Sequence, residues 1–188
     1  MVTGIILASG FSKRMGKDKL MIEINGFKMI EKVIIECKLS SLDEIIFVYR
    51  EESIKSIADK YGIKSVYNPN AHLGQSESLK LGIKEAKNSK GFMFLMGDQP
   101  FITSAVIDIL INEFKSKDFP IVVPYFGGIK GTPAIFSSIF INDIMKITGD
   151  KGARDIIKAN PEKVNKVYIN NLRMGIDIDT EEDLKKYI

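Results

Sequence analysis

Short apolar runs alternate with segments of helical periodicity along almost the whole chain. Continuous apolar runs are typical of strands buried on both faces, and apolar residues spaced three or four apart are typical of helices packed on a sheet. The apolar runs predict strands at residues 4–7, 44–49, 64–67, 91–96, 120–125 and 166–169. The periodic segments predict helices at residues 29–39, 52–61, 79–86, 103–114, 138–147 and 180–187, and another that opens near residue 154.

This alternation predicts an α/β fold in which a mostly parallel, Rossmann-like sheet lies between two layers of helices. The 188 residues suit a single domain with a sizeable core, since 45% of them are hydrophobic. In sheets of this kind, ligands bind at the carboxyl ends of the strands. Four unusual polar motifs follow predicted strands, at residues 10–19, 68–75, 98 and 177. We therefore expect these motifs to converge on one site.

The first motif, residues 10–19, combines two glycines with four cationic side chains. Successive backbone N–H groups can form a concave anion site, and Lys and Arg neutralise phosphate charge. A Walker A loop is excluded, because five residues separate the glycines and Asp18 follows Lys17. A dinucleotide fingerprint is excluded, because Ser12 stands where the second glycine is required. The loop is predicted to bind a nucleoside triphosphate, the alternative being a polar loop that merely faces solvent.

Three aspartates near the ends of predicted strands are candidate metal ligands. Asp98 follows a strongly apolar strand, and Asp177 and Asp179 alternate with isoleucines, so that both point to one face of an extended segment. Carboxylate oxygens are the ligands that Mg²⁺ prefers. We expect Asp98 to bind Mg²⁺ with one member of the later pair, Asp177 in preference to Asp179. The alternatives are that Asp98 only hydrogen-bonds its own turn and that Asp179 positions the turn before the last helix.

A glycine and several hydroxyl groups open the predicted helix that follows residues 74–79. The free N–H groups at a helix N-terminus can hold an anion. This segment could therefore bind the base, ribose or phosphates of a nucleotide, and a plain helix cap is the alternative.

The composition narrows the possible partners and compartments. The net charge is +3 and the basic residues outside the first loop are dispersed, so nucleic-acid binding is not expected. No apolar run reaches 18 residues and the start of the chain has no signal-peptide pattern, so we expect a cytoplasmic protein without a membrane span. The single Cys37 is predicted to be buried and inert, and the single His72 is assigned no role.

The stretch from Leu7 to Lys19 resembles the signature L-A-x-G-x-S-x-R-M-G-x-x-K of the MobA-like nucleotidyltransferase family, with every fixed position present. Later stretches resemble the branch of this family that attaches CMP to the molybdenum cofactor. They are the G-Q-x-x-S-L element at 74–79, the D-Q-P element at 98–100, and the segments 131–136, 149–154 and 177–184. The resemblance thus covers the whole chain in order.

This resemblance implies the nucleotide-diphospho-sugar transferase type of fold and a defined reaction. A terminal phosphate of molybdopterin would attack the α-phosphorus of CTP, with Mg²⁺ as cofactor and pyrophosphate as the leaving group. The reaction depends on in-line positioning and charge neutralisation, and it needs no protein nucleophile. Residues 1–100 would bind the nucleotide and residues 101–188 the acceptor, within a single domain of residues 1–188. A molybdenum hydroxylase is a further partner that the resemblance suggests.

The resemblance also carries roles onto individual residues of this sequence. It implies catalytic roles for Arg14, Lys19 and Asp98, and Mg²⁺ ligation by Asp98 and Asp177. The residues implied around the nucleotide are Leu7, Ala8, Ser9, Gly10, Ser12, Arg14, Lys19, Asn68, Gly74, Gln75 and Ser78. The residues implied around the acceptor are Gln99, Thr132, Pro133, Gly152 and Arg154.

One position departs from the pattern and keeps the choice of base open. Ser9 stands where the cytidylyl branch often has alanine and the guanylyl branch glycine, although Gln75 and Gln99 favour CTP. The alternatives are a guanylyltransferase, or another transferase of the same fold that acts on a sugar phosphate or similar acceptor. A nucleotide-binding protein that delivers cofactor without turnover is the alternative from another functional class.

Overall fold

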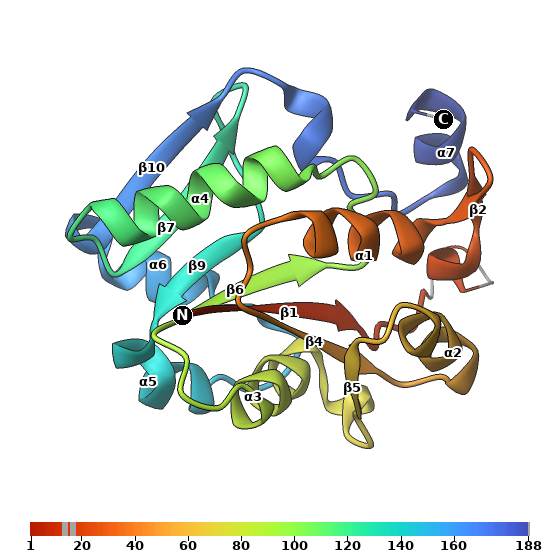
Figure 1. The fold of residues 1–188 in the computed structure, drawn as a ribbon, viewed down its shortest axis with the longest axis horizontal. Coiled ribbons are helices and arrows are strands. Elements are labelled where there is room, and N and C mark those ends of the chain that lie inside the picture. The colour runs from red at the N-terminus through yellow and green to blue at the C-terminus, as the bar shows by residue number, and fades with distance from the viewer. Residues whose placement is uncertain (13–14, 16–17, 188) are drawn as a thin grey trace.

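The computed structural model of the chain describes residues 1–12, 15 and 18–187. Figure 1 shows a central sheet with helices packed on both faces. Its strands lie in the order β10 (Val164–Ile169), β7 (Ile121–Phe126), β9 (Ala134–Ser137), β6 (Gly91–Met96), β1 (Val2–Ala8), β4 (Glu44–Tyr49) and β5 (Lys64–Tyr67). The pairs β1–β4, β1–β6, β4–β5 and β7–β10 are parallel. The predicted mostly parallel α/β fold is confirmed.

Two strands of the sheet, β8 (Ile129–Lys130) and β9, lie outside the strands predicted from the sequence. The longer of them, β9, is inserted between β6 and β7 and runs antiparallel to both. Before it, the short strand β8 pairs with β7 across a turn at Gly127 and Gly128. Both glycines have positive φ, which side-chain-bearing residues rarely adopt. The place of β9 is set by pairing with strands that are distant in the chain, which the local pattern does not encode.

The helices form two layers. Those that pack on one face of the sheet are α1 (Met29–Leu39), α2 (Glu52–Lys60), α4 (Ser104–Ser116) and α7 (Glu181–Tyr187). Those on the other face are α3 (Gln75–Glu85), α5 (Ile141–Met145) and α6 (Arg154–Ala159). Short 3₁₀ helices occupy connections: η1 (Lys19–Met21), η2 (Ala71–Leu73), η3 (Ser138–Phe140), η4 (Pro161–Lys163) and η5 (Leu172–Gly175). A hairpin of β2 (Glu23–Ile24) and β3 (Phe27–Lys28) leads into α1.

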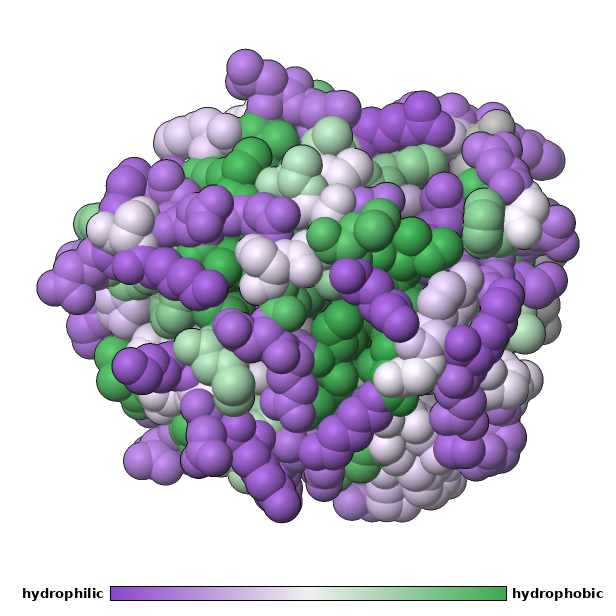
Figure 2. Space-filling view, in the orientation of Figure 1, coloured by the Kyte–Doolittle hydropathy of each residue, from purple (hydrophilic) through white to green (hydrophobic). Residues whose placement is uncertain are grey.

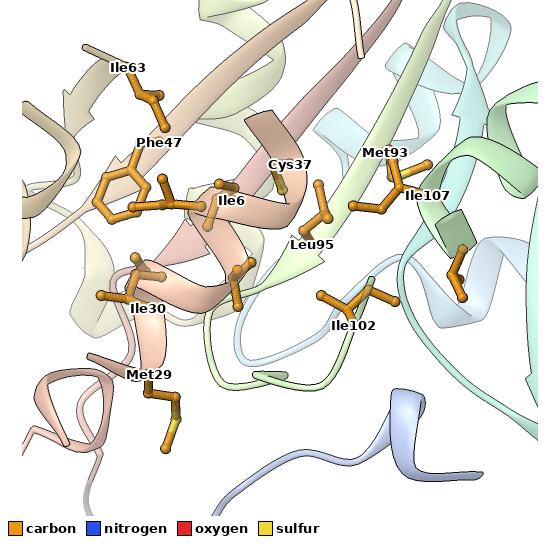
Figure 3. Packing of buried hydrophobic residues seen from close by; sticks show 14 of the residues in the cluster. Ile6, Met29, Ile30, Cys37, Phe47, Ile63, Met93, Leu95, Ile102 and Ile107 are labelled. Atoms are coloured by element: carbon orange, nitrogen blue, oxygen red, sulfur yellow. The ribbon is translucent and has the colours of Figure 1, made fainter. Parts of the chain in front are cut away.

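Successive residues of the strands point to opposite faces of the sheet, and each face packs into its own apolar core. Ile6 of β1 packs towards α1, α2 and α4, whereas its neighbour Ile5 packs towards α3 and α5. Figure 2 shows the α1 and α4 face, where polar side chains cover most of the surface and apolar residues remain visible between them. Figure 3 shows Ile30 and Cys37 of α1 among the side chains of the first core. Burial raises the pKa of the Cys37 thiol, as expected for an inert buried cysteine.

The parallel register brings the carboxyl ends of the central strands to one edge. Leu7 of β1 lies opposite Met96 of β6, and Ala8 lies opposite Tyr49 of β4. The residues that follow these strands therefore emerge side by side. This places the loop after β1 beside the loop after β6, as the sequence predicts for residues 10–19 and Asp98.

Two predicted helices differ from those observed. The helix expected from residue 79 begins four residues earlier, at Gln75, because the loop at residues 149–150 caps its first turn. The single helix expected at residues 138–147 is divided into η3 and the shorter α5. Over residues 1–12, 15 and 18–187, no helix combines the length and the apolar character that a membrane span requires.

Packing of α3 on β1 depends on Gly82. A Cβ atom at this position would lie 2.3 Å from Cγ2 of Ile5, well inside van der Waals contact. Alanine is normally better than glycine in a helix by about 1 kcal/mol. Here we expect Gly82→Ala to lower the free energy of unfolding by roughly 1–3 kcal/mol, because the added methyl overpacks the core. Urea unfolding of both proteins measures this difference.

The control for this prediction is a double-mutant cycle with Ile5→Ala. Removing the Ile5 side chain makes room for the methyl group, so the double variant should lose less stability than the two single losses together. A Gly82→Ala protein more stable than the parent would contradict the prediction.

Candidate functional site

A cleft of about 790 Å³ opens at the carboxyl edge of the sheet. Its walls come from the loop after β1, from η1, from η2 and the start of α3, and from segments near β6, α6 and α7. The lining residues are Leu7, Ser9, Gly10, Phe11, Ser12, Lys19, Leu20, Ala71, His72, Leu73, Gly74, Gln75, Ser78, Met96, Asp98, Asp150, Arg154 and Asp179.

An ammonium group shared by two carboxylates lies in this cleft. The Nζ of Lys19 donates to Oδ2 of Asp98 and to Oδ1 of Asp179, each at 2.6 Å. All three side chains are largely buried. Burial opposes the charge of Lys19, but the attraction of Asp98 and hydrogen bonds to both carboxylates outweigh it and raise the pKa of Lys19. Lys19 is therefore held protonated.

Local structure explains how three distant segments meet here. The side chain of Asp18 accepts from the N–H of Leu20 and caps η1, which carries Lys19. Gly97 allows β6 to approach β1 closely, since a Cβ there would lie 3.1 Å from the Leu7 carbonyl oxygen. The N–H of Ile178 donates to the Asp98 carbonyl at 3.0 Å and joins the segment before α7 to the tip of β6.

A second contact orients Asp179. The carboxylate of Asp183 accepts from the N–H groups of Asp179 and Thr180 and from the Thr180 hydroxyl. These hydrogen bonds, that of the Thr180 side chain first, lower the pKa of Asp183. The N-terminus of α7 thus fixes the backbone from which Asp179 reaches Lys19.

The carboxylates fit a divalent cation. Oδ1 of Asp98 is buried and has no hydrogen-bond partner among the described residues, while Oδ2 is bound to Lys19. A buried oxygen without a partner is costly, and a hard cation would satisfy it. Among residues 1–12, 15 and 18–187, no group of three or more His, Cys, Asp or Glu side chains could hold a metal alone. Mg²⁺ commonly uses one or two carboxylates and completes its shell with substrate phosphates and water.

Asp177 and Asp179 differ in their surroundings. Asp179 lines the cleft, whereas Asp177 does not. Asp177 keeps exposed surface, but protein crowds its carboxylate, and this raises its pKa to about 6. The negative charges of Asp98 and Asp179 act in the same direction, and a hydrogen bond from Gln99 opposes them. Asp177 therefore adds negative charge beside the cleft without facing it.

A neutral, buried network forms another part of the cleft wall. The hydroxyls of Ser9 and Ser78 are hydrogen-bonded to each other, and Nδ2 of Asn68 donates to Ser78 Oγ at 3.1 Å. Oδ1 of Asn68 accepts from the N–H of Asn70, which fixes the amide orientation. These contacts join the ends of β1 and β5 to α3. The hydroxyl of Ser9, the residue that departs from the family pattern, is thus engaged within the protein.

The N-terminus of α3 is capped by a loop from the second half of the chain. The N–H of Ser76 donates to the Gly149 carbonyl at 3.2 Å, and the N–H of Gln75 points to Oδ1 of Asp150 at 3.4 Å. A Cβ on Gly74 would lie 2.2 Å from the Gly149 carbonyl carbon, so only glycine fits there. The plain cap, one of the two sequence readings, is present, and the Gln75 and Ser78 side chains remain on the cleft wall.

The cleft unites most of the residues that the sequence singles out. Those that line it are Leu7, Ser9, Gly10, Ser12, Lys19, Gly74, Gln75, Ser78, Asp98 and Arg154. Ala8 ends β1, Asn68 lies behind the serines, and Gly152 packs against the Gln75 side chain. Gln99, Thr132 and Pro133 do not line the cleft, and Gln99 is buried. Arg14 lies outside the described residues.

The sequence analysis gave no individual role to several residues that line the cleft, among them Phe11, His72, Met96 and Asp150. Asp150 lies within a motif that was recognised, and His72 lies between two that were. For these two residues, the neighbouring motifs were the signal in the sequence that could have indicated a place in the cleft. Phe11 had none, because its position is variable in the family pattern.

Residues 4–164 match the family described as MobA-like NTP transferase domain. The chain is 34% identical over 137 residues to a probable molybdenum cofactor guanylyltransferase from Natranaerobius thermophilus, an alignment that covers 68% of this chain and 62% of that relative. It is 29% identical over 168 residues to the purine catabolism protein PucB of Bacillus subtilis, covering 83% of this chain and 80% of PucB. The chain thus spans under two thirds of the length of the first of these relatives.

Solved structures share the fold at low sequence identity. Rv0371c from Mycobacterium tuberculosis has a TM-score of 0.86 at 19% identity, covering 99% of this chain and 96% of that one. A nucleotidyl transferase from Methanothermobacter has a TM-score of 0.84 at 18% identity, covering 99% and 95%. Rv0371c has also been solved in complex with manganese, with a TM-score of 0.84 at 18% identity, covering 99% and 97%. With 161 matched positions in one continuous block, the chain belongs to the family of MobA-like NTP transferase domains.

Proposed function

We propose that this chain transfers a nucleoside monophosphate from a nucleoside triphosphate to the terminal phosphate of molybdopterin, with release of pyrophosphate. The observation that carries the proposal is the Lys19 ammonium between Asp98 and Asp179 in a cleft at the strand ends. Family membership supports the reaction type, and the name of the first relative supports the acceptor.

Lys19 is placed to contact a phosphate group. An ammonium has three N–H donors, and two of them go to Asp98 and Asp179. The third has no acceptor among the described residues and can donate to a phosphate oxygen. Because Lys19 is already held in place, it can stabilise developing charge without a large reorganisation.

We propose Mg²⁺ as the cofactor, held by Asp98 through its unpartnered Oδ1 and by Asp179. A bound divalent cation would neutralise phosphate oxygens and make the α-phosphorus more electrophilic. The sequence favours Asp177 as the second ligand, but only Asp179 lines the cleft and shares Lys19 with Asp98. We therefore assign Asp177 the role of supplementary negative charge.

The acceptor would enter on the α6 side. Arg154 lines the cleft at the start of α6 and forms no ion pair with any described residue. Its guanidinium is therefore available for a second phosphate group. Gly152 lies against the Gln75 side chain at the start of α3.

The nucleotide is proposed to be CTP, with GTP as the second candidate. The Gly74-Gln75 and Asp98-Gln99-Pro100 elements support CTP. The names of several relatives, which include probable molybdenum cofactor guanylyltransferases, support GTP.

The first test measures pyrophosphate release with Mg²⁺ and each of CTP, GTP, ATP and UTP, with and without molybdenum cofactor. We expect release with CTP that depends on the cofactor. Cofactor-dependent release with GTP alone would retain the mechanism and select the second candidate. Absence of release from every combination, while nucleotides still bind, would favour a delivery protein without turnover.

We expect Lys19→Ala to lower kcat by roughly 10²–10³, the scale for removal of one preorganised stabilising group. The matched control is Lys64→Ala. Lys64 is a half-exposed lysine at the amino end of β5, whereas the cleft lies at the carboxyl ends of the strands. Steady-state rates at saturating nucleotide measure both effects. A Lys19→Ala enzyme as active as the control would remove Lys19 from the mechanism.

Matched asparagine variants test the metal ligands. We expect Asp98→Asn and Asp179→Asn each to raise the Mg²⁺ concentration for half-maximal rate by at least about tenfold, the scale on which even outer partners of a metal act. Asp177→Asn should raise it less, because its carboxylate does not line the cleft. The measurement is a Mg²⁺ titration of the rate for each variant. A larger effect at Asp177 than at Asp179 would reverse the assignment.

A further inference from the structure

Phe11 and Arg50 form a contact at the cleft that the reaction described above does not use. Phe11 follows Gly10 in the first loop, lines the cleft and is 42% exposed. Arg50 directly follows the last residue of β4. The guanidinium carbon of Arg50 lies 4.3 Å from the centroid of the Phe11 ring, within the range of a cation–π interaction.

An ion pair holds the Arg50 guanidinium against this ring. Its Nη1 is paired with the Glu51 carboxylate. Its Nε is buried and has no hydrogen-bond partner among residues 1–12, 15 and 18–187. Cation–π attraction strengthens when the cation is desolvated. Arg50 therefore orients an apolar ring that still presents surface to the cleft.

The position of Phe11 relative to Lys19 suggests what the ring faces. Asp98, which holds Lys19, follows β6, whereas Arg50 follows β4, and β1 lies between these two strands. A triphosphate at Lys19 would therefore extend its nucleoside across β1 towards β4. The uncharged network of Ser9, Ser78 and Asn68 borders the same side. The charged end of the cleft suits phosphates, and the neutral, aromatic end suits a base.

We propose that Phe11, oriented by Arg50, is a stacking platform for the nucleobase. This proposal rests on the nucleotide-binding function proposed above and names a contact within that site. Stacking on an aromatic face tolerates every base, because each base has a π-face. The platform would thus supply affinity for the nucleoside, and hydrogen bonds to the base edge would supply selectivity.

The test measures equilibrium binding of CTP, GTP, ATP, UTP and inorganic triphosphate to the full chain in the presence of Mg²⁺. Inorganic triphosphate carries the phosphates without a base. We expect Phe11→Ala to weaken all four nucleotides by a similar factor, roughly ten- to a hundredfold, and to leave binding of inorganic triphosphate unchanged. Phe11→Tyr keeps the ring and should bind nucleotides as the parent does. Arg50→Met should weaken them by only about threefold, because the ring remains but loses its orienting cation.

Other outcomes would overturn the proposal. Equal loss of nucleotide and triphosphate binding in Phe11→Ala would mean that the ring only supports the phosphate loop. Loss confined to one nucleotide would indicate edge recognition. Parent protein that binds triphosphate as tightly as nucleotides would exclude any base platform while leaving the phosphate site intact. Parent protein that binds neither would refute the platform together with the proposed function.

Discussion

The ammonium of Lys19 is the contact on which the site depends. It joins segments that lie 79 and 160 residues away in the chain, through Asp98 and Asp179. Two carboxylates share one ammonium, so the cluster keeps an excess of negative charge in a largely buried place. That excess is costly without a cation, and it explains why this arrangement suits a metal–phosphate complex better than a bare phosphate. Structural support and affinity for metal therefore come from the same charges.

The two ends of the cleft carry different chemical groups, and this difference favours one orientation of a bound ligand. The β6 end carries Lys19, Asp98 and Asp179, whereas the β4 and β5 end carries hydroxyl, amide and phenyl groups whose hydrogen bonds are mostly satisfied within the protein. A neutral ring at the first end would leave buried charges uncompensated. An elongated ligand with one anionic end thus fits in one orientation.

Much of the fold follows from the sequence because most of its central strands are short apolar runs bounded by turn residues and separated by segments of helical periodicity. The strands at residues 44–49, 64–67 and 91–96 are observed with the predicted bounds. β9 was not predicted, because its place between β6 and β7 is decided by tertiary pairing. The site was predicted where residues belong to spaced motifs, as for Lys19, Asp98 and Ser78. The choice between Asp177 and Asp179 and the contact of Phe11 with Arg50 depend on loop geometry, which local pattern does not encode.

Residues 149–150, which cap the N-terminus of α3, tie the first half of the chain to the second. The helix that presents Gln75 and Ser78 begins against Gly149 and Asp150, which lie in the half of the chain assigned to the acceptor. Gly74 is packed so closely on that loop that a side chain at position 74 would require the loop to move. Residues 1–100 are therefore not self-contained, because the first turn of α3 is capped by residues 149–150. Recombination of residues 1–100 and 101–188 between relatives would therefore have to preserve this contact.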